Sequence, residues 1–402
     1  MKKRTVAIIG TVGVPANYGG FETLAEHLID HMGNQYDIHV YCSGKKYRKE
    51  ERKDSYKNAR LHYIPLEANG IQSIPYDTWS IIHALFFADV LLVLGVSGAW
   101  LLPFVKLFSK KKIIISIDGI EWKRNKWNML AKWYLFWAEG LAVKYSHIDI
   151  SDNEAIQDYT AQRYGTLSRI IEYGADHTIP KNADAGYSEY PFMAHPYAFK
   201  VCRIEPENNV HVVLKAFSEM PEYRLVMVGN WENSEYGRNL KETYKSFSNI
   251  TILDPIYDQQ KLDLIRSNAI LYIHGHSAGG TNPSLVEAMY LGLPIIAFGV
   301  SYNKVTTENK ALYFNTEEDL KHIIQSSKLS DIQKLGVNMG EIAKRRYNWK
   351  LIADKYNSLV QEALQATEKP SVVAASEELP YNELLNLGLS HIKYTEAFYS
   401  QR

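Results

Sequence analysis

The sequence lacks the features of a disulfide-rich, metal-binding or nucleic-acid-binding protein. Its only two cysteines, Cys42 and Cys202, lie far apart, so they provide neither a disulfide framework nor a metal-ligand motif. The 45 Lys and Arg balance the 45 Asp and Glu, and a chain without net charge has no overall field that attracts nucleic acid. No Asp-x-Asp pair occurs, so the carboxylate pair that often holds a metal-bound diphosphate is missing. These absences favour a reduced, cytoplasmic setting and a site without metal.

Long apolar runs are also scarce. The first ten residues place a short apolar run after basic residues and end in glycine, which is typical of a buried first strand and not of a signal peptide. Val90–Val105 is uncharged, but it contains two glycines and Pro103 and is shorter than the roughly 20 residues of a membrane-spanning helix. This segment therefore predicts a strand, a turn and a short helix.

The periodicity of the rest predicts alternating strands and helices on two doubly wound parallel sheets, an α/β fold. The expected strands are Thr5–Gly10, Asp37–Cys42, Leu61–Ile64, Val90–Leu94, Ile113–Ile117, Ile148–Ser151, Phe199–Cys202, Arg224–Val228, Thr251–Leu253, Ala269–Ile273 and Pro294–Phe298. The expected helices are Phe21–His31, Asn128–Tyr145, Asn153–Tyr164, Val210–Met220, Asn233–Phe247, Gln259–Arg266, Ser284–Leu291, Trp349–Ala366 and a further one over Tyr381–Phe398.

The length of 402 residues favours two domains. The polar, proline-bounded stretch Pro180–Pro196 is the expected linker between them. We therefore predict an N-terminal domain over residues 1–180, a C-terminal domain over 196–345, and a helical segment over 346–402 that packs back on the first domain.

The most informative stretch is His274-Gly-His-Ser-Ala-Gly-Gly-Thr-Asn-Pro-Ser-Leu-Val-Glu-Ala-Met289, which joins an expected strand to an expected helix. The backbone N–H groups of Gly279 and Gly280 lie near the positive end of that helix, where they can hold an anionic oxygen. Glu287 follows within the helix and can accept hydrogen bonds from a sugar hydroxyl. The stretch indicates a nucleotide-sugar site, and the alternative is an ordinary strand-to-helix turn.

A second glycine loop follows the first strand and ends at Gly19 and Gly20, before the next helix. Backbone amides there can approach a diphosphate closely. The loop lacks the Gly-x-Gly-x-x-Gly spacing, and the second strand does not end in the acidic residue that dinucleotide-binding folds use. A nicotinamide or flavin enzyme is therefore disfavoured, and structural glycines remain the alternative.

Two charged residues follow expected strands at their carboxyl ends. Arg203 can pair with phosphate through parallel hydrogen bonds, although an arginine there is often simply solvated. Asp118 can orient an acceptor hydroxyl, or it can belong to an Asp-Gly turn. His274 and His276 give only a weak metal signal. Without a metal, helix N-termini and Arg203 must neutralise the leaving diphosphate.

Aromatic and basic residues gather in the first half. Lysine stems beside Trp and Phe suit contact with anionic lipid headgroups, although the apolar members fit a core equally well. The members are Trp100, Phe104–Lys112, Trp122, Lys123, Arg124, Lys126, Trp127, Lys132, Trp133 and Trp137.

Four stretches together resemble the retaining glycosyltransferases of family 4, and especially the bacterial rhamnosyltransferases of capsule and cell-wall polysaccharide synthesis. They are Pro15–Thr23, Asp118–Arg124, Val201–Asn209 and His274–Met289. The resemblance implies the GT-B fold, in which two Rossmann-like domains face each other across a cleft. The N-terminal domain would bind the acceptor and the C-terminal domain the nucleotide sugar.

The resemblance also implies roles for individual residues. Gly19 and Gly20 would line the diphosphate, Arg203 would bind it, and Glu287 would hold the ribose. The glycine loop would surround the donor sugar and its phosphates, through Gly279, Gly280, Thr281 and Asn282. Three positions depart from the wider family, which has glutamate at Gly279, often lysine at Asn208, and commonly histidine at Asp118; the rhamnosyltransferase subgroup is similar to this chain at all three. The expected catalytic residues are Asp118, Arg203 and Glu287.

The expected function is transfer of L-rhamnose from dTDP-L-rhamnose, with retention, onto a lipid-linked saccharide at the inner face of the cell membrane. The enzyme would need no cofactor beyond its donor substrate, and its oligomeric state is open. The alternatives are a transferase that uses a UDP-hexose, a nucleotide-sugar epimerase of the same fold, and a binding protein without turnover.

Overall fold

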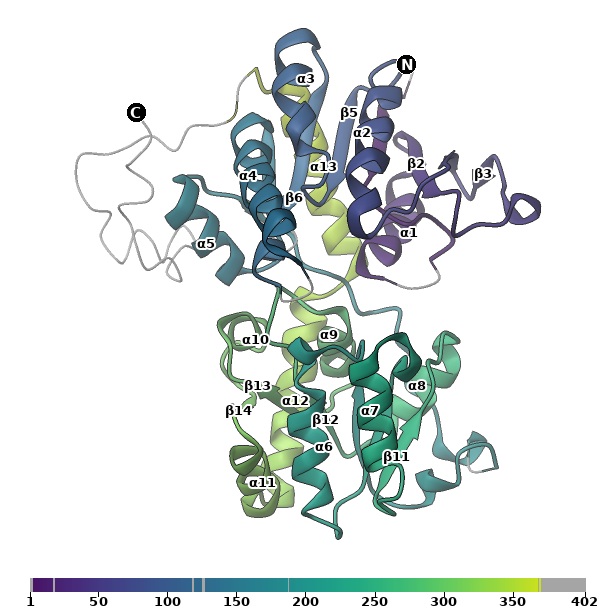
Figure 1. Cartoon of the computed structure of the whole chain (residues 1–402), viewed down its shortest axis with the longest axis vertical. Helices are drawn as coiled ribbons and strands as arrows, with labels where there is room; N and C mark the ends of the chain where they lie inside the picture. The colour runs from purple at the N-terminus through teal and green to yellow at the C-terminus, as the bar shows by residue number, and fades with distance from the viewer. Residues whose placement is uncertain are drawn as a thin grey trace. The chain divides into compact units, whose positions relative to one another are not determined.

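The computed structural model describes residues 3–16, 19–117, 119–124, 127–186, 188–367 and 369. The chain divides into two compact units, which we call unit 1 (residues 1–172 and 350–402) and unit 2 (residues 173–349). Each unit is built on its own sheet, and helices connect the strands (Figure 1).

The sheet of unit 1 has the strand order β3-β4-β2-β1-β5-β6-β7-β8 within the described residues, and only the β3–β4 pair is antiparallel. From β1 the chain moves outward through β2 to β4 and then crosses to the other side at β5. The strands are β1 (Thr5–Ile9), β2 (Asp37–Ser43), β3 (Ser55–Tyr56), β4 (Ala59–Ile64), β5 (Val90–Leu94), β6 (Lys112–Ile117), β7 (Ile148–Ser151) and β8 (Arg169–Ile170). The reversal between β1 and β5 is the kind of switch point at which such sheets bind ligands.

The central strands of unit 1 are uninterrupted runs of buried apolar residues, as expected for a parallel sheet with both faces covered by helices. In β1 and β5 every residue is buried. The helices of the unit are α1 (Gly20–Met32), α2 (Ser73–Ala84), α3 (Leu102–Phe108), α4 (Met129–Tyr145), α5 (Glu154–Tyr164) and α13 (Trp349–Gln365), the last of which begins at the final residue of unit 2.

Unit 2 repeats this plan. Its strand order is β11-β10-β9-β12-β13-β14, with every pair parallel, so its switch point lies between β9 and β12. The strands are β9 (Ala198–Val201), β10 (Leu225–Val228), β11 (Ile250–Leu253), β12 (Leu271–His274), β13 (Ile295–Phe298) and β14 (Leu312–Phe314). The helices are α6 (Val210–Ser218), α7 (Glu235–Tyr244), α8 (Gln259–Ser267), α9 (Pro283–Tyr290), α10 (Ser301–Thr306), α11 (Glu317–Ser326) and α12 (Leu329–Arg346).

The core of unit 2 lies between its sheet and three helices. Residues of α6, α7 and α11 pack with side chains from β9, β10 and β12 in one apolar cluster. Figure 1 shows α6 and α7 in front of the strands in this view.

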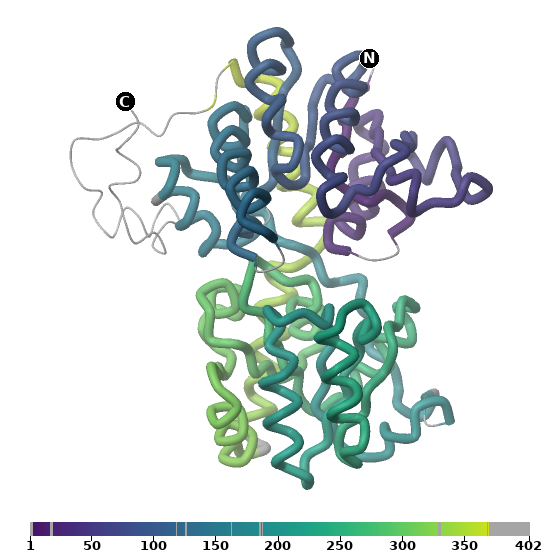
Figure 2. Tube along the Cα trace, viewed as in Figure 1, coloured from purple at the N-terminus to yellow at the C-terminus, as the bar shows by residue number. Residues whose placement is uncertain are grey.

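The last described helix, α13, packs on unit 1 although it follows unit 2 in sequence. Asn357 accepts a hydrogen bond from Tyr36 at 2.6 Å, Lys355 pairs with Glu172 at 2.5 Å, and Glu362 pairs with Arg169 at 2.7 Å. Figure 2 shows this yellow end of the trace running among the purple and blue segments of unit 1. The helix expected over Tyr381–Phe398 lies outside the described residues.

The division between the units falls at Tyr173, whereas the sequence pattern placed the linker at Pro180–Pro196. That stretch packs against α8 of unit 2: the amide of Lys181 donates to Ser267 Oγ at 3.1 Å, and Glu189 pairs with Lys261 at 2.6 Å. These side-chain contacts carry no signal in local composition, which is why the stretch looked like a linker.

The uncharged segment Val90–Val105 forms β5, a turn, the short helix η3 (Ala99–Leu101) and the start of α3, as predicted. Among the described residues, every helix falls short of the length and apolarity that crossing a bilayer requires.

Candidate functional site

The loops that follow β9 and β12, on either side of the switch point of unit 2, are joined by hydrogen bonds. Glu207 O accepts from the amide of Ser277 at 2.8 Å, and Asn209 Nδ2 donates to Gly275 O at 2.8 Å. Asn208 and His276 are also linked, with 2.8 Å between Asn208 Oδ1 and His276 Nδ1. The two loops therefore form one structure at the carboxyl ends of the strands.

Gly275 allows this close approach. A Cβ atom at this position would lie 2.2 Å from Asn208 O and 2.8 Å from Lys200 Nζ, so any other residue would force the loops apart. Lys200 extends from β9 beneath the loop and is almost completely buried. Burial lowers the pKa of Lys200. The glycine is thus required by packing, apart from any ligand.

The glycine loop continues into the N-terminus of α9. Gly279 has φ 122°, a conformation that L-residues with a side chain rarely adopt, and Gly280 and Thr281 after it are buried. Asn282 caps the helix by accepting from the amide of Ser284 at 3.1 Å, and Pro283 occupies the first turn. The predicted residues Gly279 to Asn282 therefore lie at the positive end of a helix dipole.

Glu287 lies on α9 between two basic side chains. Its Oε2 is 2.7 Å from Nη1 of Arg266, which projects from α8 and is only 1% exposed. Its Oε1 is 3.2 Å from Nε2 of His177. The indole of Trp349 donates to Nδ1 of His177 at 3.0 Å, so the proton of a neutral imidazole is on Nε2 and points at Glu287.

These neighbours decide the charge of Glu287. Burial alone would raise the pKa of the carboxyl, but Arg266 and His177 outweigh it and hold the pKa below its ordinary value. Glu287 is therefore an ionised carboxylate with a fixed orientation. Each carboxylate oxygen has a second lone pair, so Glu287 can still accept hydrogen bonds from a diol while Arg266 and His177 are bound to it.

Arg203 lies two residues beyond β9, and its side chain is 42% exposed. Its nearest acidic partner is Glu205, with 3.8 Å between Arg203 Nε and Glu205 Oε2. At that distance and exposure the pair is weak, so the guanidinium remains able to bind an anion. The structure thus brings Arg203, the glycine loop and Glu287 into unit 2, on the loops and the helix that follow β9 and β12.

Asn208 stands where the resembled family often has a lysine, and its role here is structural. It is buried, its Nδ2 donates to Arg203 O at 2.8 Å, and its Oδ1 contacts His276. Asn208 therefore links the Arg203 loop to the glycine loop.

In unit 1, the loop after β1 leads to Gly19 and Gly20 at the start of α1. Gly19 has φ 131°, and a Cβ atom there would lie 1.9 Å from Oε2 of Glu22. Oε1 of Glu22 accepts from the amide of Val12 at 2.6 Å. The anion closest to Gly19 is thus a carboxylate of the chain itself, a feature that the sequence analysis missed.

The remaining predicted residues add no further group to the candidate site within the described part of the chain. Asp118 lies outside the described residues, as does Lys126 of the aromatic and basic group. The rings of His274 and His276 are 6.2 Å apart, and the imidazole of His274 is buried. Among the described residues no group of three or more His, Cys, Asp or Glu is placed to hold a metal ion.

Arg266, His177 and Trp349 were also missed by the sequence analysis. They come from α8, from the segment before β9 and from the start of α13, so nothing in the local pattern connects them with Glu287. One signal was available: Arg266 directly follows the apolar pair Leu264 and Ile265 in an expected helix, and a buried cation requires an anionic partner.

Two family models match the chain, each over one part of it. Residues 3–176 match the family described as "Domain of unknown function (DUF1972)", and residues 191–346 match the family described as "Glycosyl transferases group 1". No curated protein is significantly similar in sequence to the chain.

Solved structures are similar over nearly the whole chain. Sucrose-phosphate synthase from Thermosynechococcus elongatus has a TM-score of 0.75 and 16% identity, covering 90% of this chain and 99% of that one. A glycosyltransferase from Rickettsia africae has a TM-score of 0.68 and 14% identity, covering 91% and 100%. HepE from Anabaena in complex with UDP-glucose has a TM-score of 0.68 and 13% identity, covering 89% and 99%.

These similarities and the two parallel sheets show the fold. The chain has the two-domain GT-B fold, and residues 191–346 match the group 1 glycosyl transferase model, so the fold prediction is confirmed.

Proposed function

We propose that the protein is a glycosyltransferase that uses a nucleotide-sugar donor, and that the donor binds to the loops of unit 2 at the β9–β12 switch point. One observation carries the proposal: an exposed arginine, a glycine loop at a helix N-terminus and a fixed carboxylate all follow β9 and β12. Together they match the three parts of such a donor, which are a diphosphate, a sugar and a ribose. The match to a glycosyltransferase model over the same residues supports this assignment.

The diphosphate would be neutralised by Arg203 and by the amides of Gly279, Gly280 and Thr281. Phosphate oxygens accept hydrogen bonds from both kinds of group, and removal of one preorganised donor of this kind typically slows a reaction about 10²–10³-fold. Asn282 would lie beside the donor sugar. Neutralisation by backbone and guanidinium requires no divalent cation, so we expect activity without one.

Glu287 would bind the ribose hydroxyls. Arg266 and His177 keep its carboxylate ionised and fix its rotamer, so little conformational entropy is lost when a diol binds. In this arrangement Arg266 and His177 are positioning residues, and Glu287 is the group that contacts the donor.

For the reaction we propose transfer with retention, in which the leaving phosphate helps to remove the acceptor proton. This mechanism needs no enzyme nucleophile. Asp118, which follows β6, is the residue that we propose for orienting the acceptor hydroxyl. Gly19 and Gly20 are proposed to approach the diphosphate; because Glu22 is so close to Gly19, its carboxylate would have to move or be neutralised.

As the specific activity we propose transfer of L-rhamnose from dTDP-L-rhamnose to a lipid-linked saccharide by a cytoplasmic protein bound peripherally at the inner membrane face. The support is the resemblance of four sequence stretches to the rhamnosyltransferase subgroup. The neighbour HepE was crystallised with UDP-glucose, which makes a UDP-hexose the donor to test against dTDP-L-rhamnose.

The test is a donor screen by mass spectrometry, with membrane extract as acceptor source and with EDTA in parallel samples. We expect a deoxyhexose mass increase from dTDP-L-rhamnose that survives EDTA. A hexose increase from UDP-glucose alone would overturn the rhamnose assignment, and loss of all transfer in EDTA would overturn the metal-free site. Isomerisation of the donor without acceptor would instead indicate an epimerase.

A further inference from the structure

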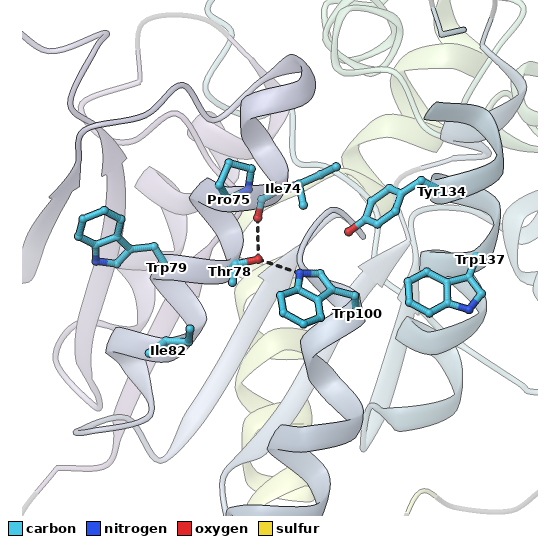
Figure 3. Close-up of a pocket in the computed structure, with 8 residues that line it drawn as sticks. All are labelled: Ile74, Pro75, Thr78, Trp79, Ile82, Trp100, Tyr134 and Trp137. Atoms are coloured by element: carbon cyan, nitrogen blue, oxygen red, sulfur yellow. Dashed lines mark hydrogen bonds between the residues drawn. The ribbon is translucent and has the colours of Figure 1, made fainter. Parts of the chain in front are cut away.

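Unit 1 contains an apolar pocket that the proposed donor site does not use (Figure 3). It is a depression open to solvent, with a volume of about 770 Å³, and it is lined by α2, η3 and α4. Its lining residues are Ile74, Pro75, Thr78, Trp79, Ile82, Trp100, Tyr134 and Trp137. Pockets that bind small molecules typically measure about 300–1,000 Å³, so the space suffices for a ligand.

The hydroxyl groups of Thr78 and Tyr134 and the indole N–H of Trp100, all in the wall of this pocket, are already bonded within the protein. Thr78 Oγ1 donates to Ile74 O at 2.7 Å and accepts from Trp100 Nε1 at 2.9 Å, as the dashed lines in Figure 3 show. The hydroxyl of Tyr134 donates to Ser97 O. A sugar in the pocket would leave most of its hydroxyls without partners, which is costly, whereas a hydrocarbon needs none.

Helix α2 has large apolar residues on both its buried and its exposed face. Its buried face includes Asp77 and Ser80, while Trp79 is 52% exposed and Ile82 is 45% exposed. Burial raises the pKa of Asp77 well above its ordinary range. A helix that buries a carboxyl group and exposes large apolar side chains gains stability when something apolar covers the exposed face.

The apolar surface continues along α4. Leu130, Trp133 and Trp137 are exposed, and the rings of Trp133 and Trp137 stack in parallel with centroids 6.4 Å apart. Figure 3 shows α2 on one side of the pocket and α4 on the other, with Trp100 between them. The pocket is therefore the concave centre of a larger apolar face.

The pocket lies toward the carboxyl ends of the strands of unit 1, where α/β sheets bind ligands. Helix α2 starts after β4, η3 follows β5, and α4 follows β6. Ser73 Oγ donates to Ser97 Oγ at 2.9 Å, which ties the start of α2 to the loop after β5, beside the switch point. A chain held in the pocket would thus have its head at the β1–β5 switch point.

Charge near the pocket favours an anionic head. The exposed Lys45 lies beside the start of α2, with its Nζ 3.0 Å from Oε1 of Gln72. Lys132 lies on α4, two residues before Tyr134 of the pocket wall, and the exposed Lys123 follows β6 ahead of that helix. An amphiphile with a phosphate group next to its hydrocarbon chain satisfies both the apolar wall and these cations.

We propose that this pocket binds the hydrocarbon chain of the lipid-linked acceptor, next to the phosphate that joins the chain to its saccharide. The inference rests on the proposed glycosyltransferase function and adds the place where the acceptor lipid is held. Trp79, Trp100 and Trp137 surround the chain, and the phosphate and the first sugar lie toward the loops after β1 and β5.

The test is binding of farnesyl phosphate, a soluble single-chain isoprenoid phosphate, followed by tryptophan fluorescence and calorimetry. We expect saturable binding to the full chain that Ile82→Asp weakens about tenfold or more, since a charge would enter an apolar contact. Val337→Asp, at an exposed residue of α12 in unit 2, is the matched control and should bind normally. A photoreactive farnesyl phosphate should label peptides of α2 and α4.

Several outcomes would overturn the proposal. They are no binding of farnesyl phosphate, equal binding by both variants with labelling elsewhere, binding only to anionic phosphatidylglycerol vesicles, or self-association of the protein that Ile82→Asp abolishes.

The proposed function can fail separately. If every donor is inactive while farnesyl phosphate still labels α2 and α4, the glycosyltransferase assignment fails and the pocket stands. If nucleotide sugars bind and soluble acceptors are modified while farnesyl phosphate does not bind, only the pocket assignment fails.

Discussion

The two units have sheets of similar topology, but the groups around the two switch points differ in chemistry. In both, the chain starts at a central strand, moves outward and returns on the other side, which creates a switch point between β1 and β5 and another between β9 and β12. Unit 2 surrounds its switch point with glycines, an arginine and a carboxylate. Unit 1 places exposed tryptophans and an apolar pocket beside its own. The comparison teaches that the fold supplies a position for a ligand, and that the side chains of the loops and helix faces determine which class of ligand can bind there.

The largest expected effect is the loss of the buried cation of unit 2. Arg266→Met leaves the Glu287 carboxylate without its main partner, and breaking such a buried pair typically costs about 3–5 kcal/mol. Hydrogen exchange followed by mass spectrometry should show faster exchange in peptides of α8 and α9 and unchanged exchange in β1 and β5. Faster exchange throughout both units would mean that they do not respond as separate bodies.

The second prediction concerns the exposed arginine of the same unit. Arg203→Ala should lower the rate of sugar transfer about 10²–10³-fold with little effect on stability, because the side chain is solvated and only weakly paired. Arg238→Ala, at an exposed arginine of α7, is the control and should retain full activity. Full activity of the Arg203 variant would remove the phosphate assignment.

The third prediction separates a structural from a functional role at Asn208. Asn208→Lys restores the residue that the resembled family often has, but it removes buried hydrogen bonds to Arg203 and His276. We expect a loss of about 1–3 kcal/mol in the free energy of unfolding, measured with urea. Asn239→Lys, at an exposed site in α7, should be neutral. Tighter nucleotide-sugar binding by the Asn208 variant would contradict a purely structural role for Asn208.

The smallest effect concerns acid sensitivity in unit 1. Burial, helped by the neighbouring His39 and His83, lowers the pKa of His62 to about 4, and burial with two nearby lysines lowers the pKa of His147 to about 4. Below the ordinary histidine pKa of about 6.5, His62 and His147 bind protons in the unfolded chain but stay neutral in the folded chain. Stability is therefore full above pH 6.5 and falls as the pH drops toward 4.

For each of these histidines the loss should be on the order of 1 kcal/mol at pH 5. His147→Asn keeps an acceptor for the amide of Ile113, which now bonds His147 Nδ1 at 3.1 Å, and should reduce the difference in unfolding free energy between pH 7 and pH 5. His322→Asn, at an exposed residue of α11, should leave that difference unchanged. If the unfolding free energy of the His147 variant changed with pH as much as that of the unchanged chain, His147 would not be a source of the acid sensitivity.

Sequence patterns predicted the central strands well because their signal is local. Each of β1, β5 and β6 is a mostly apolar, buried run, and the predicted bounds differ from the observed ones by at most a residue. The short strands β3, β8 and β14 were missed, since two or three residues contain too little periodicity. Helix α2 was missed for a different reason: its buried face mixes Ser and Asp with Tyr76 and Ile81, and its exposed face is also apolar, so its two faces differ little in hydrophobicity.

The site was predictable only in part. Glycines, Arg203 and Glu287 follow strands in the sequence, and the carboxyl ends of parallel strands collect such residues at one edge. The partners of Glu287 could not be predicted, because Arg266 and His177 approach it from other segments. Glu22 beside Gly19 was overlooked for a related reason. The spacing of the two residues in the sequence does not predict the rotamer of Glu22, and it is this rotamer that places the carboxylate against Gly19.

By itself, the sequence determined that this chain is an α/β protein with two doubly wound sheets and with glycine loops after particular strands, because hydrophobic periodicity and turn residues act over short stretches of chain. Only the tertiary structure decided which charges meet. It set Arg266 and His177 against Glu287, placed Glu22 at Gly19, and opened an apolar pocket between α2 and α4. The physical reason is that charge state and cavity shape depend on side chains brought together from distant segments, and their contacts leave no trace in local composition.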